Sequence, residues 1–468
     1  MFGPSFSDTI KVKVFPTFHY VFIRNRKKYL SYLPPQSRFR YHPNITIMSR
    51  SLVYCLAVFF FLSCSEPKAD NACDLEDSNF LPNIFYRLAI KDKSDQCGYR
   101  VSPKTPACLL SYEETHLEEN WPQVKAEMET QFALGSGDNE TLVQYRSETV
   151  SSVIGSAYPA FQGALNAPNG NVYFAPYYSP KVLAIDPITK DFSTTGNFSG
   201  SVTFIGASLG PGGIIYYAPH QIYDFFALDT SQNLISIVGN DSTMTGTAYN
   251  GAIYAPNGKI YFVPSSENII RYYDTNSKTI GSVSTPTTGG FSNAVLTPQG
   301  KIYFIPFTAT TMYILNTKDD SVSTHPYSFP SGSKYISGIL TPNGRIYMIP
   351  FDQPNQIIYL DTNTQQIETV ASIPSAINSM FNGAVLAPNG KIYLVPENYP
   401  NFISFDTSDH SFKTLFPKPT GSYRGGALGP DGDIYLASHT VDRFDLIHTN
   451  SNGKFCDSLR LSPYWNKL

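Results

Sequence analysis

Polar side chains that are far apart in the sequence occupy equivalent places in a repeated segment and could together bind a ligand. Three lie six residues before a repeated proline, and three lie nine residues after it. The candidate ligand-binding residues are Arg424, Gln162, Asn382, His439, Glu397 and Tyr177. Arginine offers forked donors to an anion, and amides and imidazole add further hydrogen-bonding groups. We expect a site for a polar ligand such as a sugar or a carboxylate. The alternative is a solvated rim whose side chains differ without function.

Seven copies of one unit must position these side chains. The unit reads aromatic-x-Gly-Ala-x-x-x-Pro-x-Gly-x-Ile-Tyr-x-x-Pro, and successive copies start 42 to 46 residues apart. Glycine lies two residues after the first proline, Val or Ile four residues after it, and Tyr five residues after it. The repeated prolines are Pro168, Pro211, Pro256, Pro298, Pro342, Pro388 and Pro430. Five matched columns in seven copies indicate a true structural repeat.

Each copy has the pattern of four strands joined by tight turns. In the third copy the expected strands are 249–255, 259–264, 269–274 and 278–283. The Ala-Pro-Asn-Gly turn between the first two has Pro and Gly where a type I turn prefers them. A repeat of about 44 residues with four strands is typical of a propeller blade. We therefore predict an all-β fold, a seven-bladed β-propeller of four-stranded blades over residues 161–460.

The strand directions place the candidate residues at one end of this propeller. Strands one and two are antiparallel, so the residue six before the proline and the residue nine after it lie at the same end. The inner set is Gln162, Ile205, Asn250, Ser292, Ile336, Asn382 and Arg424. Blades six, seven and one carry the polar groups, while blades four and five present Phe307 and Phe351. Small residues are expected at the crowded hub, and the aromatic columns are expected to pack between blades.

The repeat resembles the propeller repeats of the NHL and YVTN types and of virginiamycin B lyase. These families share a Pro-Asp/Asn-Gly-x-Ile/Leu-Tyr/Trp turn and an Ile-Asp-x-x-Thr stretch. Residues 185–189 (Ile-Asp-Pro-Ile-Thr) and 360–364 (Leu-Asp-Thr-Asn-Thr) match the second motif. The resemblance covers about residues 161–460 and implies the propeller fold. One fold of this kind hosts many functions, so the resemblance is weak for activity.

An enzyme of the lyase or lactonase type is the alternative function. The resemblance to virginiamycin B lyase implies His and Glu acting with Mg²⁺, and gluconolactonase-like propellers ring a divalent metal with Glu, Asn and Asp. The inner set contains no carboxylate, and His220 and His439 lie two blades apart. We therefore assign no catalytic residue, no metal ligand and no cofactor.

A segment starting at Met48 has the features of a secretory signal. Two residues, Ser-Arg, precede about a dozen apolar residues, which are too few to span a membrane. Leu62-Ser63-Cys64 resembles a bacterial lipobox, although Phe61 stands where Leu is usual. We predict a signal peptide over 48–63 and acylation of Cys64, with a plain signal peptide or an ordinary anchor as alternatives. Ser, not Asp, follows Cys64, which favours the outer over the inner membrane.

Charge separates the N-terminal region from the rest. Residues 1–50 hold nine Lys or Arg and one Asp, so the remaining chain has a net charge of −11. An acidic body without a basic stripe argues against a nucleic-acid partner. We interpret residues 1–47 as the result of a start site assigned too far upstream, the true start being Met48. A basic cytoplasmic tail is the alternative. The charged fraction of 15% is too low for a disordered chain or a coiled coil.

The remaining cysteines fit an exported protein. Cys55 lies in the signal and Cys64 would carry lipid, so four cysteines could form two disulfides or stay as buried thiols. They are Cys73, Cys97, Cys108 and Cys456. A bridge from Cys456 would tie the two ends of the chain together. Residues 64–160 are expected to form an anchor, a linker and a small Cys-containing segment. That segment should include a helix near 122–134 and a strand over 145–153, and 461–468 should form a tail.

Taken together, these features predict a lipid-anchored protein of the bacterial cell envelope. Its propeller is expected to bind a ligand or a protein, or to act as a scaffold. The expected partners are the membrane, through N-terminal acylation, and a protein or carbohydrate.

Overall fold

The protein is described here from a computed structural model. It describes residues 80–89 and 105–467, apart from 136–138, 146, 157–159, 199–202, 245, 288, 353 and 376. The chain divides into two units, Met1–Pro103 and Lys104–Leu468, and each is treated by itself. The first contains helix α2 (Phe80–Ala89). The predictions on residues 1–47, the signal segment 48–63, Cys64, Cys73 and Cys97 lie outside the described residues. Within the described part, no helix is both long and apolar enough to cross a bilayer.

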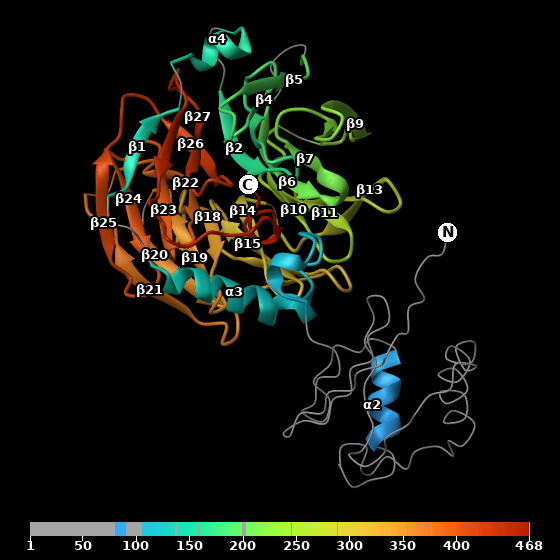
Figure 1. Cartoon of the computed structure of the whole chain (residues 1–468). Coiled ribbons are helices and arrows are strands. Elements are labelled where there is room, and N and C mark those ends of the chain that lie inside the picture. Colours follow the sequence, from blue (N-terminus) through green and yellow to red (C-terminus); the bar gives the residue numbers. More distant parts are fainter. Residues whose placement is uncertain are drawn as a thin grey trace, which may run out of the picture. The chain divides into compact units, whose positions relative to one another are not determined.

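Seven four-stranded antiparallel sheets form a ring in the second unit, which confirms the predicted seven-bladed β-propeller (Figure 1). The first three blades are β2 (Phe161–Asn166), β3 (Val172–Pro176), β4 (Val182–Ile185) and β5 (Phe192–Thr195); β6 (Phe204–Gly210), β7 (Ile214–Pro219), β8 (Asp224–Asp229) and β9 (Leu234–Asn240); and β10 (Tyr249–Tyr254), β11 (Lys259–Pro264), β12 (Ile269–Asp274) and β13 (Thr279–Ser284). The 3₁₀ turn η5 (Pro211–Gly213) joins β6 to β7.

The next three blades follow the same order. They are β14 (Phe291–Leu296), β15 (Lys301–Pro306), β16 (Tyr313–Asn316) and β17 (Ser321–Thr324); β18 (Tyr335–Leu340), β19 (Arg345–Pro350), β20 (Gln356–Asp361) and β21 (Ile367–Ser372); and β22 (Phe381–Leu386), β23 (Lys391–Pro396), β24 (Asn401–Asp406) and β25 (Phe412–Pro417). The innermost strand of each blade contacts the innermost strand of the next, so the ring closes around an axial channel.

The seventh blade joins the two ends of the propeller sequence. Three strands come from the last repeat, namely β26 (Tyr423–Leu428), β27 (Ile434–Ser438) and β28 (Asp445–His448). The outermost strand is β1 (Thr141–Gln144), which pairs antiparallel with β28. The predicted segment 64–160 therefore supplies one strand of the ring.

The strand predicted over 145–153 is wrong in position. Only the N–H of Tyr145 continues the pairing, by donating to the Phe444 carbonyl at 2.7 Å. Residues beyond it form helix α4 (Val150–Ile154) because local capping favours a helix there. The Thr149 side chain accepts a hydrogen bond from the Ser152 N–H, and Gly155 ends the helix in the left-handed conformation.

The hub requires glycine for conformation as well as for size. Each innermost strand has a register shift near its hub position. Five of these positions are glycines with φ between 79° and 153°: Gly163, Gly206, Gly251, Gly383 and Gly425. A Cβ on Gly383 would lie 2.9 Å from the Cα of Gly425 in the next blade. In blades four and five the hub residues are Asn293 and Ser337, whose side chains reach the channel.

The Tyr column packs between blades, as expected, and all seven side chains are at most 3% exposed. The structure also explains why the column is Tyr and not Phe. The Tyr303 hydroxyl accepts a hydrogen bond from Gln365 Nε2 of the next blade at 2.9 Å. The Tyr347 hydroxyl oxygen likewise lies 3.1 Å from His410 Nε2 of the next blade. These hydroxyls link adjacent blades, so the ring is joined by polar contacts as well as by apolar packing.

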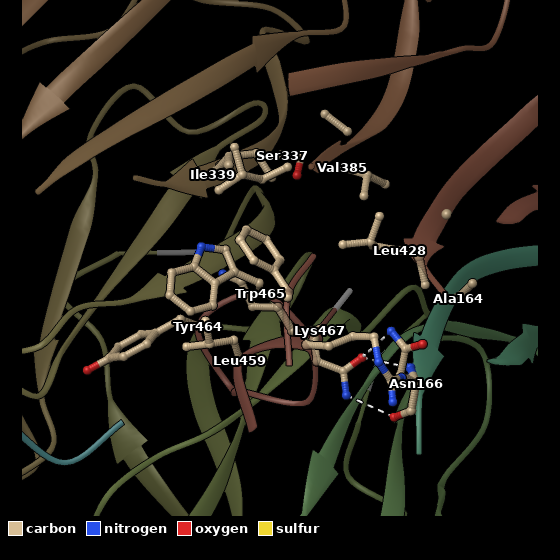
Figure 2. Close-up of a pocket in the computed structure, with 18 of the residues that line it drawn as sticks. Ala164, Asn166, Ser337, Ile339, Val385, Leu428, Leu459, Tyr464, Trp465 and Lys467 are labelled. Carbon is tan, nitrogen blue, oxygen red and sulfur yellow. Dashed lines mark hydrogen bonds between the residues drawn. The ribbon is translucent and has the colours of Figure 1, made fainter. Parts of the chain in front are cut away.

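The last residues of the chain enter the ring and close one end of the channel (Figures 1 and 2). They follow helix α5 (Asp457–Arg460) and make contacts with several blades. Trp465 Nε1 donates to the Leu340 carbonyl in blade five at 2.8 Å. The Asn466 side chain exchanges hydrogen bonds of 2.7 and 2.8 Å with the backbone of Asn166 in blade one. The residues predicted to be a tail thus form the floor of the channel.

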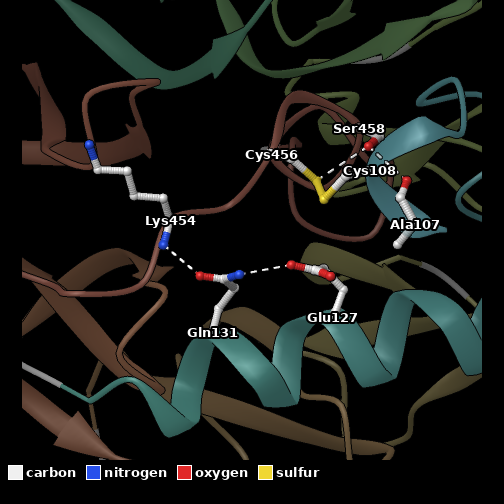
Figure 3. Close-up of a disulfide and its surroundings, with 7 residues drawn as sticks. All are labelled: Ala107, Cys108, Glu127, Gln131, Lys454, Cys456 and Ser458. Atoms are coloured by element: carbon white, nitrogen blue, oxygen red, sulfur yellow. Dashed lines mark hydrogen bonds between the residues drawn. A yellow bond between two sulfur atoms is a disulfide. The ribbon is translucent and has the colours of Figure 1, made fainter.

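The floor is covered by the segment that precedes the propeller. This segment contains η3 (Ala107–Leu109), η4 (Glu118–Asn120) and α3 (Trp121–Ala133), which confirms the helix predicted near 122–134. A disulfide joins Cys108 to Cys456, and Gln131 of α3 accepts a hydrogen bond from the Lys454 N–H at 2.8 Å (Figure 3). A bridge from Cys456 to the N-terminal segment, one of the possibilities that the sequence left open, is therefore present.

Candidate functional site: the mouth of the axial channel

The seven residues of the predicted inner set all line one cavity of about 30 Å³ at the open end of the channel. We call this end the mouth. The cavity is also lined by Asn293, Ser337 and four of the hub glycines. Its volume holds about two water molecules. A ligand of the size of a sugar must therefore lie across the mouth and not inside this cavity.

An ion pair between blades six and seven forms the polar side of the mouth. Arg424 donates from Nε and Nη2 to Glu397 Oε1, at 3.1 and 2.6 Å. The second carboxylate oxygen, Oε2, accepts a hydrogen bond from Asn382 Nδ2 at 2.8 Å. Arg424 also reaches blade one, where its Nη1 lies 3.3 Å from Gln162 Oε1. The Arg and Glu side chains are 22% and 11% exposed, so the pair is fixed and largely desolvated.

Tyr177 and His439 complete this side of the mouth. The Arg424 guanidinium lies 5.7 Å from the centre of the Tyr177 ring, and that ring lies 5.4 Å from the His439 ring. Burial, together with the nearby charge of Arg424, lowers the pKa of His439 to about 4, so the imidazole is neutral at neutral pH. Its Nδ1 atom is buried and has no hydrogen-bond partner among the described residues. All six candidate residues therefore belong to one contiguous cluster.

The other side of the mouth is aromatic, as the repeat positions predicted. The rings of Phe307 and Phe351, from blades four and five, meet edge to face with centres 5.3 Å apart. Both are half-buried. Tyr178 packs against Tyr177 at 4.5 Å and is 46% exposed. The mouth thus combines a hydrogen-bonding arc with aromatic surfaces.

The side chains at the mouth do not suit the divalent metal that the resemblance to lyases and lactonases implies. The carboxylate of Glu397 already accepts hydrogen bonds from Arg424 and Asn382, which compete with a cation for its oxygens. His220 Nδ1 lies 3.1 Å from the Tyr249 carbonyl, in a different part of the ring from His439. Across the part of the chain that the structure describes, no three His, Cys, Asp or Glu side chains gather as metal ligands do.

A second cavity of about 50 Å³ lies deeper in the channel, against the floor (Figure 2). Asn293 and Ser337 line both cavities, so the two are neighbours along the axis. The floor cavity also contains Arg460 and Lys467, which the sequence analysis did not select. These residues lie outside the repeats, so no comparison of repeat positions could select them. The available signal was Cys456, which lies four residues before Arg460 and could join the N-terminal segment.

Comparisons with known proteins support the fold. No family model matches the chain, and no curated protein sequence matches it. A solved structure of streptogramin B lyase is similar, with a TM-score of 0.57 and 15% identity over 67% of this chain and 98% of that chain. Catalytically inactive virginiamycin B lyase from Staphylococcus aureus, solved with quinupristin, has a TM-score of 0.56 and 14% identity over 66% of this chain and 99% of its own. At these identities the likeness establishes a β-propeller of this kind and no activity.

Proposed function

We propose that this protein is a lipid-anchored binding protein of the bacterial cell envelope whose propeller binds an uncharged, hydroxyl-rich ligand of the carbohydrate class at the mouth. The observation that carries the proposal is the network of Arg424, Glu397 and Asn382. It places several hydrogen-bonding groups at fixed positions while its formal charges cancel.

Charge compensation decides between the two ligand classes expected from the sequence. An anionic ligand would have to displace Glu397, because that carboxylate holds both Nε and Nη2 of Arg424. Breaking such a partly buried pair leaves one charge without a partner, which is costly. A neutral sugar avoids this cost, since hydroxyl groups both donate and accept hydrogen bonds. The network therefore favours a sugar over a carboxylate.

The aromatic arc supports the same ligand class. The apolar C–H faces of a sugar ring pack well on aromatic rings, while the hydroxyl groups at its edge seek polar partners. Phe307 and Phe351 lie on blades four and five, which continue the ring from blade six of the polar arc, and Tyr178 adds an exposed ring beside Tyr177. A ligand lying over a cavity of only about 30 Å³ could contact both arcs at once.

Binding of a glycan library to the full-length protein in detergent tests the proposal. Arg424→Ala should weaken glycan binding at least tenfold, because it removes the centre of the network. Arg271→Ala is the matched control. Arg271 also pairs with a carboxylate, that of Asp241, and its side chain is similarly buried at 16% exposure. This control should bind within about twofold of the wild type.

Two outcomes would contradict the proposed ligand. If the wild type and Arg424→Ala bind every glycan equally, the mouth is not the glycan-binding site. Selective capture of a protein from solubilised envelopes, with no glycan bound, would replace the carbohydrate with a protein partner. Both outcomes leave the predicted membrane anchor untested, so the anchor needs a separate experiment.

The anchor rests on the sequence around Cys64. Acyl chains contribute about 0.8 kcal/mol per buried CH₂, so several chains hold a protein on a membrane permanently. Cys64→Ser should move the protein from the membrane fraction to the soluble fraction. Cys55→Ser, in the preceding apolar segment, should leave it membrane-bound. Mass spectrometry of the mature N-terminus should find lipid on Cys64 and no peptide from residues 1–47.

A further inference from the structure

The floor cavity holds two cationic side chains without a lining carboxylate. Arg460 and Lys467 both line this cavity of about 50 Å³. Its other polar lining residues are Asn166, Asn293, Asn466, Ser337 and the tyrosine and tryptophan of the C-terminal segment. No Asp or Glu is among the described residues that line it. Buried cations normally have a charged partner, and of these two only Arg460 has one, Asp457, which does not line the cavity.

Arg460 is the more deeply buried of the two cations. The residue is 5% exposed, and its Nη2 donates to Asp457 Oδ1 at 2.8 Å. The Asp457 side chain is itself 80% exposed, so it compensates the guanidinium from the solvent side. The Nε and Nη1 atoms are buried and have no hydrogen-bond partner among the described residues. The guanidinium therefore has donors left over that an additional acceptor could use.

Lys467 has a weak partner for a cation. Its Nζ donates to the Ala294 carbonyl in blade four, which carries no formal charge. Burial lowers the pKa of this amine to about 7, because the charged form is poorly solvated in the channel. An anion beside it would supply the missing compensation.

We propose that the floor cavity binds a small oxyanion, of the size of formate, nitrate or hydrogen carbonate, between Arg460 and Lys467. A small oxyanion suits this guanidinium because its oxygens can accept from the N–H donors that Asp457 leaves unused. The amide and hydroxyl groups of Asn293 and Ser337 would complete the site on the side of the mouth. This site is separate from the proposed carbohydrate site and does not depend on it.

The size and accessibility of the cavity define the class of anion. A volume of about 50 Å³ corresponds to about four water molecules, which suits an anion of three or four heavy atoms. The cavity lies next to the mouth cavity, with which it shares the lining residues Asn293 and Ser337. Larger anions such as sugar phosphates exceed this volume. Sulfate serves as a larger inorganic anion for comparison.

Thermal unfolding of the full-length protein at constant ionic strength tests the proposal. Sodium formate and sodium nitrate should raise the midpoint by about 3 °C when present at about 100 times the dissociation constant. Sodium sulfate should give a smaller rise. Arg460→Met and Lys467→Met should each abolish the difference between the anions. Lys318→Met is the control, because Lys318 is exposed and pairs with Glu118 on the surface. It should respond as the wild type does.

A second measurement keeps the proposal testable if Arg460→Met does not fold. Trp465 lines the floor cavity, and Trp121 is the other tryptophan of the chain. In Trp121→Phe, nitrate should quench the remaining emission with saturation, and Lys467→Met should restore simple collisional quenching. Emission and unfolding that do not depend on the anion would show that the chain satisfies these cations by itself. That result would overturn the proposal, as would equal responses in wild type and Lys467→Met.

Discussion

The two ends of the axial channel each contain a buried arginine, but they differ in how its charge is compensated. At the mouth, Arg424 comes from one blade and its partner Glu397 from the next, so charge is balanced within the repeats. At the floor, Arg460 and Lys467 come from the C-terminal segment and face a cavity with no lining carboxylate. This difference is the basis for proposing a neutral ligand at the mouth and an anion at the floor. The same residue type, arginine, is thus proposed to select different ligands at the two ends because its charge is compensated differently.

The two ends also differ in how they are held. The mouth is built from strand ends, and each strand is secured by the sheet of its own blade. The floor is held by side-chain contacts, by an isolated β-bridge between Ser208 and Lys467, and by one disulfide, Cys108–Cys456, between residues 348 apart in sequence. We therefore expect the floor to open more easily than the mouth. The predictions below test this difference and the difference in charge.

The largest expected effect follows removal of the disulfide. The double variant Cys108→Ser and Cys456→Ser should lower the free energy of unfolding by about 3–5 kcal/mol, since closing a loop of this length restricts the unfolded chain strongly. Hydrogen exchange should rise first in residues 457–467. Exchange in β26, at the mouth, should change only with global unfolding. The comparison fails if β26 exchanges faster to the same extent as the floor.

The repeats allowed the mouth to be predicted but gave no information about the floor. Strand direction and alternation place residues 162, 382 and 424 at one end of the ring, and the structure finds all seven inner-set residues around one cavity. The ion pair with Glu397 could not be derived, because it depends on the side-chain reach between blades. Residues 461–467 are short and lack periodicity, so only Cys456 pointed to their position. The strand at 141–144 was misplaced because Thr149 and Gly155 cap a helix that follows it.

An effect of intermediate size, on the pH dependence of stability, is expected when a buried histidine near the floor is replaced. His116 is 1% exposed and packs edge-on against Tyr254, and burial lowers its pKa to about 4. The unfolded chain takes up this proton near pH 6.5 and the folded chain only near pH 4, so stability falls as the pH decreases between these values. His116→Phe keeps an aromatic ring and removes the titration. When the pH is lowered from 6.5 to 4, the free energy of unfolding of this variant should fall by about 2 kcal/mol less than that of the wild type, as measured by chemical denaturation.

The mouth offers a comparison for this titration. The pKa of His439 is also about 4, but Arg424 contributes to that value along with burial. Arg424→Ala should therefore raise the pKa of His439 and leave that of His116 unchanged, as followed by NMR of the imidazole C–H protons. Parallel shifts of both histidines would mean that the substitution alters the whole ring, and the two ends could not be treated as independent.

The smallest effect on stability is expected when the negative charge at the mouth is removed, which leaves Arg424 without a charged partner. The same change should have a clear effect on anion binding. Glu397→Gln keeps an acceptor for Arg424 and a contact for Asn382 but removes the compensating charge. It should cost about 1 kcal/mol of stability, because both side chains retain some solvent contact. In an Arg460→Met background, which lacks the floor response, this change should restore a midpoint increase of about 1–2 °C with formate. If the double variant stays insensitive to formate, charge compensation is not what separates the two ends, and cavity shape must be.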